Sequence, residues 1–379
     1  MKLLARYFIG GMIGGMLISL LVGCHSRLSE NASPDQTQQG KGQQYKDGRF
    51  AQDFRLVDTP NAQGSPVNVN DFADQIKLIG QSSPKLYANT RTTFDAIESW
   101  VKTGGNISKL NQFGLLAYQM QGEDNYGNVK FTGYYTPVLQ ARYSKQGEFK
   151  YPLYRMPTKS RIRLPNRAAI YNGALNEKWI IGYSNSLIDN FFMEVQGSGY
   201  VDFGDGKPLT FFGYGGKNGH AYRSLGKVLI DRGEIPRKKM SMKAIRQWAE
   251  NHSESEVRQA LEQNPSFVFF KPEPYTAVRG ASAVPLVAKA SVASDKALVP
   301  PGTVLLAEVP VLDSLGRFTG KYLMRLMVAL DTGGAIKGNH FDIYHGIGVE
   351  AGEMAGFYNH YGRVWVLKTS PYGFLATNQ

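Results

Sequence analysis

The chain has 379 residues, of which 42% are hydrophobic and 20% are charged. This composition excludes a disordered or collagen-like chain and fits one large globular unit or two ordinary domains. The single cysteine excludes an intrachain disulfide and any zinc or iron–sulfur site built from several cysteines. The formal net charge of +12 favours an anionic partner, but it does not distinguish nucleic acid, a membrane surface and an acidic polymer.

The first two dozen residues predict a lipoprotein signal. Lys2 and Arg6 precede an uncharged and mostly apolar run, residues 7–22, which is shorter than a typical membrane span. The run leads into Leu21-Val22-Gly23-Cys24, which resembles the bacterial lipobox. We therefore expect residues 1–23 to be a signal peptide and Cys24 to be the lipidated N-terminus. An uncleaved anchor with an incidental cysteine is the alternative.

The residues after Cys24 predict the location of the mature protein. Position 25 is His rather than Asp, so the usual inner-membrane retention signal is missing and we expect lipid anchoring at the outer membrane, facing the periplasm. Residues 24–44 are rich in Ser, Gln, Asn, Gly and Lys, which is typical of a flexible tether. A protein in this place meets murein, whose peptide stems carry carboxylates, and little nucleic acid. The expected partner is therefore peptidoglycan.

The pattern along the rest of the chain predicts a few helices and many strands. Phe94, Ile97 and Val101 have helical spacing, and residues 110–120 suggest a second helix. Short aromatic or β-branched runs predict strands at 130–136, 179–183, 190–196 and 209–212. Two helices follow: Ser241 caps residues 242–250, and Ser253 with Glu256 forms a capping box for a helix that ends near Gln263.

The last hundred residues contain long, Val-rich segments without a helical period. We expect strands at 266–271, 284–294, 304–311, 322–330 and 363–369. Such strands must pair with one another to remove exposed edges. They therefore predict most of a closed barrel.

The densest group of reactive side chains is the glycine-rich segment from Asp331 to Asp342. Asp342 lies between Phe341 and Ile343-Tyr344, and an apolar setting raises the pKa of a carboxyl by desolvation. Such a carboxyl holds a proton near neutral pH and suits general acid catalysis. The alternative is structural: Asp331 caps a turn, and Asp342 ends a strand at the surface.

Two other interpretations of this segment remain. Asp331-Thr332-Gly333 matches the short aspartic-protease signature, but the chain contains no second copy. His340, Asp342 and His345 could bind a metal, although strand alternation would place His345 on the opposite face. We therefore expect no catalytic metal.

A second group of polar residues lies on glycine-rich turns. A phosphate-binding loop is excluded because Gly216-Lys217 is followed by Asn218 and the glycine spacing is wrong. The remaining amides, hydroxyls and aromatic rings suit a sugar, which offers both apolar faces and hydroxyl groups. A well-formed hairpin without a binding role is the alternative. The candidate residues are Gln196, Ser198, Tyr214, Asn218, Tyr222 and Arg223.

Taken together, these motifs resemble the membrane-bound lytic murein transglycosylase A family over nearly all of the mature chain. The matching stretches, besides the lipobox, are residues 42–48, 124–127, 131–137, 195–200, 216–223, 267–271, 331–338 and 341–342. The resemblance implies a mainly β fold: a double-psi β-barrel of the barwin and endoglucanase type, with a smaller inserted β domain and a few peripheral helices. The implied domains are a discontinuous barrel, 45–137 and 272–379, and an inserted domain, 138–271, with a substrate groove between them. The barrel module is named after three aspartates, which here correspond to Asp295, Asp331 and Asp342.

The resemblance also implies an activity. The family cleaves the β-1,4 bond between N-acetylmuramic acid and N-acetylglucosamine without water and leaves a 1,6-anhydromuramic acid end. Asp342 is the expected acid and then base, Asp331 its electrostatic partner, and no cofactor is required. Thr132, Gly133, Tyr134 and Lys337 join the candidate substrate-binding residues. A non-catalytic murein-binding lipoprotein and a hydrolase that uses water remain alternatives, and other proteins of murein synthesis or hydrolysis are possible partners.

Overall fold

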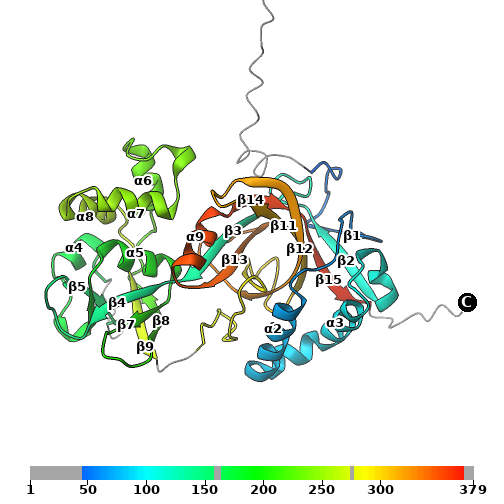
Figure 1. Cartoon of the computed structure of the whole chain (residues 1–379), viewed down its shortest axis with the longest axis horizontal. Coiled ribbons are helices and arrows are strands. Elements are labelled where there is room, and N and C mark those ends of the chain that lie inside the picture. The colour runs from blue at the N-terminus through cyan, green and yellow to red at the C-terminus, as the bar shows by residue number, and fades with distance from the viewer. Residues whose placement is uncertain (1–44, 158–163, 274–276, 371–379) are drawn as a thin grey trace, which may run out of the picture. The chain divides into compact units, whose positions relative to one another are not determined.

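The computed structural model describes residues 45–157, 164–273 and 277–370 (Figure 1). The predicted signal peptide, the lipidation site Cys24 and nearly all of the tether therefore lie outside the described residues. Within those ranges, the structure contains no helix that is both long and apolar enough to cross a membrane. The strands of this part of the chain belong to two sheets, and the fold is mainly β with several helices.

The first sheet has nine strands, which come from both ends of the chain. In spatial order they are β1 (Phe54–Val57), β2 (Leu115–Met120), β15 (Val364–Thr369), β11 (Val304–Leu312), β12 (Phe318–Asp331), β10 (Ser291–Ala293), β13 (His340–Ile347), β3 (Val129–Thr136) and β14 (Asn359–Gly362). Most pairs are antiparallel, but β10 runs parallel to β12, and β13 runs parallel to β3. The second of these parallel pairs positions the candidate site.

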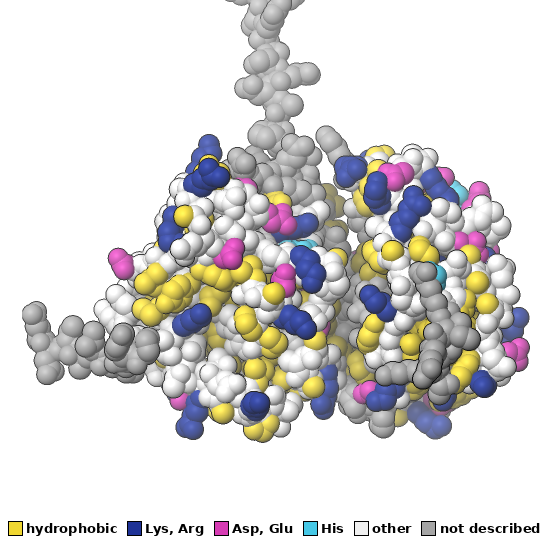
Figure 2. All heavy atoms as spheres, turned by 180° about the vertical axis from the view of Figure 1, so that it is seen from behind, with side chains coloured by type: hydrophobic (Ala, Val, Ile, Leu, Met, Phe, Trp, Pro, Cys, Tyr) yellow, Lys and Arg dark blue, Asp and Glu magenta, His cyan; other side chains and the backbone are white. Residues whose placement is uncertain are grey.

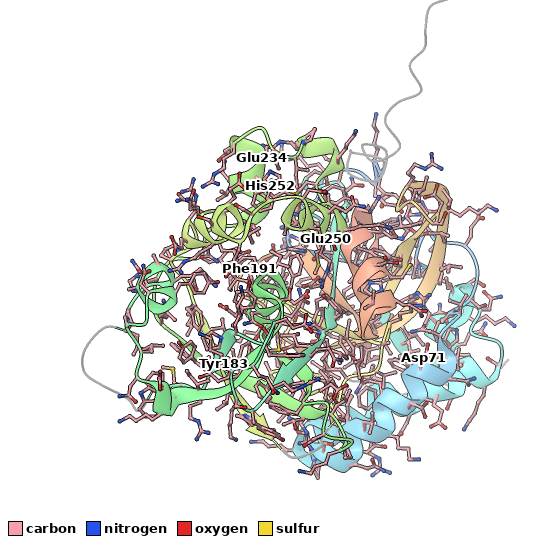
Figure 3. The ribbon with its side chains drawn as sticks, turned by 60° about the vertical axis from the view of Figure 1, so that its left-hand side comes forward. Asp71, Tyr183, Phe191, Glu234, Glu250 and His252 are labelled. Atoms are coloured by element: carbon pink, nitrogen blue, oxygen red, sulfur yellow. The ribbon has the colours of Figure 1, made fainter. Side chains whose placement is uncertain are left out.

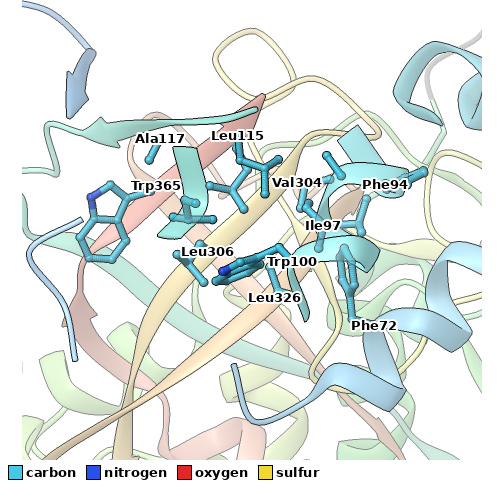
Figure 4. Close-up of a cluster of buried hydrophobic side chains, with 14 of the residues drawn as sticks. Phe72, Phe94, Ile97, Trp100, Leu115, Ala117, Val304, Leu306, Leu326 and Trp365 are labelled. Atoms are coloured by element: carbon cyan, nitrogen blue, oxygen red, sulfur yellow. The ribbon is translucent and has the colours of Figure 1, made fainter. Parts of the chain in front are cut away.

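Strand β11 shows why the sequence of the first sheet is almost continuously apolar. Val304 and Leu306 point into a core that α2 (Val69–Ser82) and α3 (Pro84–Lys102) cover. Figure 4 shows Phe72, Phe94, Ile97 and Trp100 of these helices in that core. Leu305 and Ala307 point to the opposite face and into a second core. A strand buried on both faces has no polar side to alternate with.

The second core lies inside the curve of the first sheet. Side chains of seven of its strands, from β2 to β3, meet there; they include Met120, Phe131, Met327, Phe341 and Val366. The curve also brings β14 beside β11, where a Cβ on Gly362 would collide with the Glu308 carbonyl oxygen. In the described strand pairing, β1 and β14 remain at the two ends of the sheet. The ladder of strand pairs in the described residues does not close, so the predicted closed barrel is not confirmed and the strands form a curled sheet.

The second sheet has six strands, all from the middle of the chain. In spatial order they are β5 (Tyr151–Tyr154), β6 (Ile180–Ser184), β4 (Val138–Arg142), β7 (Gly199–Asp202), β8 (Thr210–Lys217) and β9 (Val268–Glu273). Its helices are α4 (Arg167–Tyr171), α5 (Leu187–Gln196), α6 (Leu225–Asp231), α7 (Met242–Glu250) and α8 (Glu254–Glu262). Phe191 of α5 packs among α6, α7 and α8, and Figure 3 shows it below Glu234 and His252. The chain passes from the first sheet to the second at Pro137, between β3 and β4.

Three of the predicted elements were wrong or too long. Residues 110–120 were expected to be helical, but a 3₁₀-helix, Ile107–Phe113, ends at left-handed Gly114 and is followed by β2. Residues 190–196 were expected to form a strand, but they belong to α5, which begins after the Ser186 cap and ends at left-handed Gly197. The expected strand 284–294 is reduced to β10. Helix α7 and the capping box of α8, between Ser253 and Glu256, are confirmed.

Candidate active site

The site is built on one face of the parallel strands β3 and β13. Their register aligns Thr132 with Asp342 and Tyr134 with Tyr344. Residues two apart on a strand share a face, so Thr132 and Tyr134 point to the same side as Asp342. The rings of Tyr134 and Tyr344 lie side by side, with their centroids 5.2 Å apart. Direct pairing of β3 with β13 therefore brings together residues that are about two hundred positions apart in the sequence.

Asp342 lies mostly out of solvent on this face and has one close polar contact. The Thr132 hydroxyl donates to Asp342 Oδ1 over 2.7 Å. Burial raises the pKa of Asp342 to about 6, although the Thr132 hydrogen bond opposes the shift and the negative charge of Asp331 adds to it. A carboxyl with this pKa is present in both charge states near neutral pH. It can therefore give up a proton and take one back.

Asp331 lies at the end of β12, next to the same site. Its Oδ2 accepts from the Tyr134 hydroxyl over 2.9 Å, and its Oδ1 accepts from the amides of Ala281 and Thr332, each over 2.8 Å. Burial raises the pKa of Asp331, and these three donors oppose that shift. Ala293 of β10 is aligned with Asp331 on one side and Asp342 on the other. The two aspartates thus stand two strand spacings, or about 10 Å between Cα atoms, apart.

Asp295, the third aspartate of the motif, holds the loop that joins β12 to β13. Its Oδ2 accepts from the Gly338 amide over 3.0 Å, and its Oδ1 accepts from the Ala297 amide over 3.1 Å. These amides lower the pKa of Asp295, and the positive charge of Lys337 acts in the same direction. Lys337 itself is exposed in this loop. Asp295 therefore fixes the segment that positions Asp331 and Asp342, and Lys337 lies at its surface.

Three of the six candidate residues between β4 and β9 lie near β3. Gln196 Oε1 accepts from the Tyr135 amide over 3.1 Å, next to Tyr134. A Cβ on Gly197, between Gln196 and Ser198, would be 3.9 Å from the Tyr214 ring. Tyr214 is 57% exposed, so its ring is available to a ligand. The structure thus brings Gln196, Ser198 and Tyr214 together beside the strand that carries Thr132 and Tyr134.

An apolar cluster joins this region to the aspartates. Tyr200 of β7 and Phe211 of β8 pack with Val278 and with Tyr344 of β13, and Tyr134 packs against the same cluster. The two sheets therefore meet directly beside Asp331 and Asp342. Their contact fixes the candidate site from both sides.

The other three of these candidate residues lie elsewhere, between β8 and α6. Asn218 is 3% exposed, and its amide group contacts backbone atoms of residues 165, 220, 265 and 267. Arg223 is tied to the end of α8, where its guanidinium donates to Gln263 Oε1 over 3.3 Å. Tyr222 is 56% exposed beside it. Asn218 thus holds loops together, and it is not brought into the group around Gln196.

Gly133 faces away from the aspartates. A Cβ at this position would lie 2.7 Å from the Cα of Ala355 and 2.9 Å from the ring of His345. Ala355 belongs to α9 (Val349–Phe357), which packs on β3 and β13 from behind. Glycine is therefore required for this helix to approach the strand, because any side chain would collide with the helix backbone.

Sequence reasoning treated His340 only as a possible metal ligand. In the structure its Nε2 lies 2.8 Å from the Thr132 hydroxyl, which also contacts Asp342. His345 is on the other face of β13, as strand alternation predicted, and packs against Tyr358. Among the described residues, no group of three His, Cys, Asp or Glu side chains could hold a metal ion. The signal for His340 was its two-residue spacing from Asp342, which places both on one face of a strand.

On the face shown in Figure 2, the side chains that carry the positive charge are not concentrated on one element. Figure 2 shows Lys and Arg side chains scattered over one face of the molecule, with Asp and Glu among them. On this face, charge alone therefore does not single out a binding surface. The aspartates and the aromatic rings around them are the more specific feature.

Two family models match this chain. One, described as the MltA specific insert domain, matches residues 130–271. The other, described as a 3D domain, matches residues 290–368. The second match contains all three aspartates of the site, and the first contains Thr132, Tyr134 and Gln196.

Curated relatives and solved structures agree with these matches. The membrane-bound lytic murein transglycosylase A of Escherichia coli strain K12 is 62% identical over 360 residues, covering 95% of this chain and 96% of the relative. The protein of that name from Vibrio cholerae is 44% identical over 92% of each chain. The crystal structure of E. coli MltA with bound chitohexaose superposes with a TM-score of 0.84 at 65% identity, covering 88% of this chain and 99% of that one.

Proposed function

The chain belongs to the membrane-bound lytic murein transglycosylase A family, and on this premise we propose that it cleaves peptidoglycan glycan strands without water. The bond cleaved is the β-1,4 bond between N-acetylmuramic acid and N-acetylglucosamine, and the product end is 1,6-anhydromuramic acid. The observation that carries the proposal is the position of Asp342, which lies mostly out of solvent on the face that β13 shares with β3 and accepts from the Thr132 hydroxyl over 2.7 Å. Burial raises its pKa to about 6, which suits alternate donation and acceptance of one proton.

In the first step, Asp342 protonates the glycosidic oxygen, and the bond from that oxygen to C1 of the muramic acid breaks. Positive charge develops on the sugar ring, as in other glycoside cleavages. The carboxylate of Asp331 stabilises this charge from about two strand spacings away.

In the second step, the Asp342 carboxylate removes the proton of the C6 hydroxyl of the muramic acid. At the same time the C6 oxygen forms a bond to C1. The proton that left Asp342 is replaced, the ring closes, and no water is consumed. A hydrolase would need a second free carboxyl as nucleophile or base. Both oxygens of Asp331 already accept hydrogen bonds from three donors, which supports a mechanism with one acid and base.

The glycan is proposed to lie between the two sheets. Gln196, Ser198 and Tyr214 flank the site from one side, and Thr132 and Tyr134 from the other. An exposed tyrosine ring offers a face to the apolar side of a sugar. The E. coli relative crystallised with chitohexaose, a β-1,4 chain of N-acetylglucosamine, supports a groove for an extended glycan.

The architecture that goes with this function is also a proposal. The curled nine-stranded sheet would be a double-psi barrel made of residues 45–137 and 272–379, and the six-stranded sheet an inserted domain, 138–271. The mature protein would be anchored through Cys24 in the outer membrane and face the periplasm.

Digestion of purified murein sacculi tests the proposed function. The protein without residues 1–24 and its Asp342→Asn variant are compared, and the products are resolved by mass. We expect muropeptides lighter by one water at the muramic end from the parent protein, and a loss of at least about a hundredfold in the variant. Sedimentation with sacculi should be the same for both proteins, because the amide keeps the shape of the side chain.

Each other result has a defined meaning. Reducing ends would identify a hydrolase on the same scaffold. The absence of soluble product from both proteins, with both sedimenting, would identify a murein-binding protein. Substantial activity of Asp342→Asn would remove Asp342 from the acid role.

A further inference from the structure

Three side chains form a continuous chain of polar contacts that ends at the proposed acid. His340 Nε2 lies 2.8 Å from Thr132 Oγ1, and Thr132 Oγ1 lies 2.7 Å from Asp342 Oδ1. The Thr132 hydroxyl therefore stands between two groups that can each accept its hydrogen. His340 is only 9% exposed, so water does not replace either contact freely.

The backbone carbonyl of Ala335, in the loop that Asp295 holds, favours the charged form of the His340 ring. Because Nε2 faces Thr132, a lone pair on Nε2 for the Thr132 hydrogen requires the ring proton on Nδ1. Burial and the positive charge of Lys130 lower the pKa of His340 below its ordinary range, while Glu123 opposes them. The lowered pKa favours a neutral ring at neutral pH, and a neutral ring with its proton on Nδ1 presents a lone pair on Nε2 to the Thr132 hydroxyl.

This arrangement gives the Thr132 hydroxyl two possible orientations. If its hydrogen points to Nε2, its oxygen can only accept, and a protonated Asp342 can donate to it. If its hydrogen points to Asp342, it stabilises the carboxylate and leaves Nε2 without a donor. The first orientation satisfies all three groups when Asp342 is neutral, and the second suits the ionised carboxyl.

We propose that His340 is a positioning residue that acts through Thr132. By giving the Thr132 hydroxyl a second acceptor, it lets that hydroxyl turn away when Asp342 holds a proton and turn back when Asp342 has lost it. The proposal rests on Asp342 acting as acid and then base, as described above. It adds that the carboxyl is hydrogen-bonded in both charge states and that its neutral form is favoured by His340.

The proton count is unchanged by this rotation. Asp342 first turns its proton from the Thr132 oxygen to the leaving oxygen and releases it there, and the Thr132 hydrogen then turns from His340 to the new carboxylate. Asp342 then takes the proton of the C6 hydroxyl, and the Thr132 hydrogen returns to Nε2. His340 keeps one proton throughout. Asp331 and Tyr134 also face Asp342, but they are bonded to each other and take no part in the rotation.

The test compares His340→Met, which has no strong acceptor, with His340→Gln, whose amide oxygen can accept the Thr132 hydrogen. The rate of release of anhydromuropeptides at saturating sacculi is measured from pH 4.5 to 8. Because activity requires protonated Asp342 at the start, the rate falls above the pKa of that group. We expect the alkaline limb of the pH–rate profile of His340→Met to move to lower pH by about half to one pH unit. The alkaline limb of His340→Gln should coincide with that of the parent protein.

A second measurement does not depend on activity or on the folding of a variant. Nitrogen-15 NMR of histidine in the parent protein distinguishes the two imidazole tautomers, and we expect the His340 proton on Nδ1. A proton on Nε2, or a His340→Met limb that coincides with the parent limb, would overturn the proposal. The mass of the products tests the proposed function separately from the role of His340. Reducing ends would reject the transglycosylase, whereas the His340 tautomer and the alkaline limb of the pH–rate profile test the positioning role of His340.

Discussion

At the scale of single residues, Asp342 differs from the other two aspartates in how much hydrogen bonding opposes its desolvation. Asp331 accepts from three donors and Asp295 from two backbone amides, whereas one hydroxyl contacts Asp342. Desolvation therefore dominates at Asp342 and places its pKa at about 6. The three carboxyls thus differ in how readily they hold a proton, because their surroundings shift their pKa values differently.

The first prediction concerns the pH dependence of the activity. Asp342 must be protonated to act as acid, and its raised pKa means that this form is lost as the pH rises through about 6. The turnover rate should therefore fall by up to tenfold per pH unit above that value. Initial rates on sacculi at saturating substrate check this. A rate that is flat from pH 5 to 8 would contradict an acid with this pKa.

Element-scale packing makes Gly133 a structural rather than a binding position. In Gly133→Ala the new methyl would collide with the backbone of α9 at Ala355, at 2.7 Å, so strand and helix must separate. We expect a loss of about 1–3 kcal/mol in the free energy of unfolding. Urea unfolding measures it. The matched control is Gly334→Ala, in the loop after Asp331, where a Cβ meets nothing within 4 Å. Equal stability of the two variants would rule out the collision.

A second element-scale prediction concerns the ion pair that joins α4, α5 and β9. Arg167 is 1% exposed and donates to both carboxylate oxygens of Glu194, over 3.0 and 2.8 Å, while the Val268 amide donates to Glu194 as well. Arg167→Met leaves the carboxylate buried without its partner. We expect a loss of about 3–5 kcal/mol in unfolding free energy.

Guanidinium unfolding of Arg167→Met, followed by tryptophan fluorescence, provides the measurement. Arg91→Met is the control, because its pair with Asp95 is exposed at the surface of α3 and should change the stability little. If both variants unfold at the same denaturant concentration, the buried pair does not hold the second sheet together.

The elements also explain which parts of the site the sequence could predict. Asp342 was recognisable because its apolar neighbours are adjacent in the chain. The contact of Thr132 with His340 joins residues 208 apart and depends on the register of a parallel strand pair, which local pattern does not encode. Residues 190–196 were misassigned because a short apolar run fits a helix as well as a strand. The capping residues Ser186 and Gly197 were the decisive signals.

The extent of the barrel could be predicted less well than its strands. β11, β12 and β15 lie close to where their patterns placed them. Whether the sheet closes depends on the pairing of β1 and β14, which are four residues each and carry little pattern. The structural role of Asn218 could not be predicted from the sequence either. An asparagine whose amide bonds backbone groups looks the same in a sequence as one that binds a sugar.

At the scale of the whole molecule, a buried histidine links stability to pH. His345 lies under α9 with neither ring nitrogen bonded within the described part of the chain, and burial lowers its pKa from 6.5 to about 3. Lys289 and Arg325 act in the same direction. Between these two pH values the unfolded chain binds a proton that the folded protein does not. The folded state therefore loses stability as the pH falls from 6.5 towards 3.

The measurement is urea unfolding of the parent protein and of His345→Gln at pH 7 and pH 4.5. The stability difference between the two proteins should move by about 2–3 kcal/mol in favour of the variant at the lower pH. Other ionisable groups titrate alike in both proteins and cancel in this comparison. A difference that does not vary with pH would mean that the pKa of His345 is the same in the folded and the unfolded protein.

The order of the strands also determines when during synthesis this enzyme can become active. Thr132 and Tyr134 on β3 need β13 beside them, and β2 needs β15, which ends at Thr369. A growing chain therefore carries half of its site for some two hundred residues before the other half is made, and such distant pairings form slowly. With Asp342 as the proposed acid, the polypeptide therefore lacks a complete site until β13, which ends at Ile347, has been made and has paired with β3.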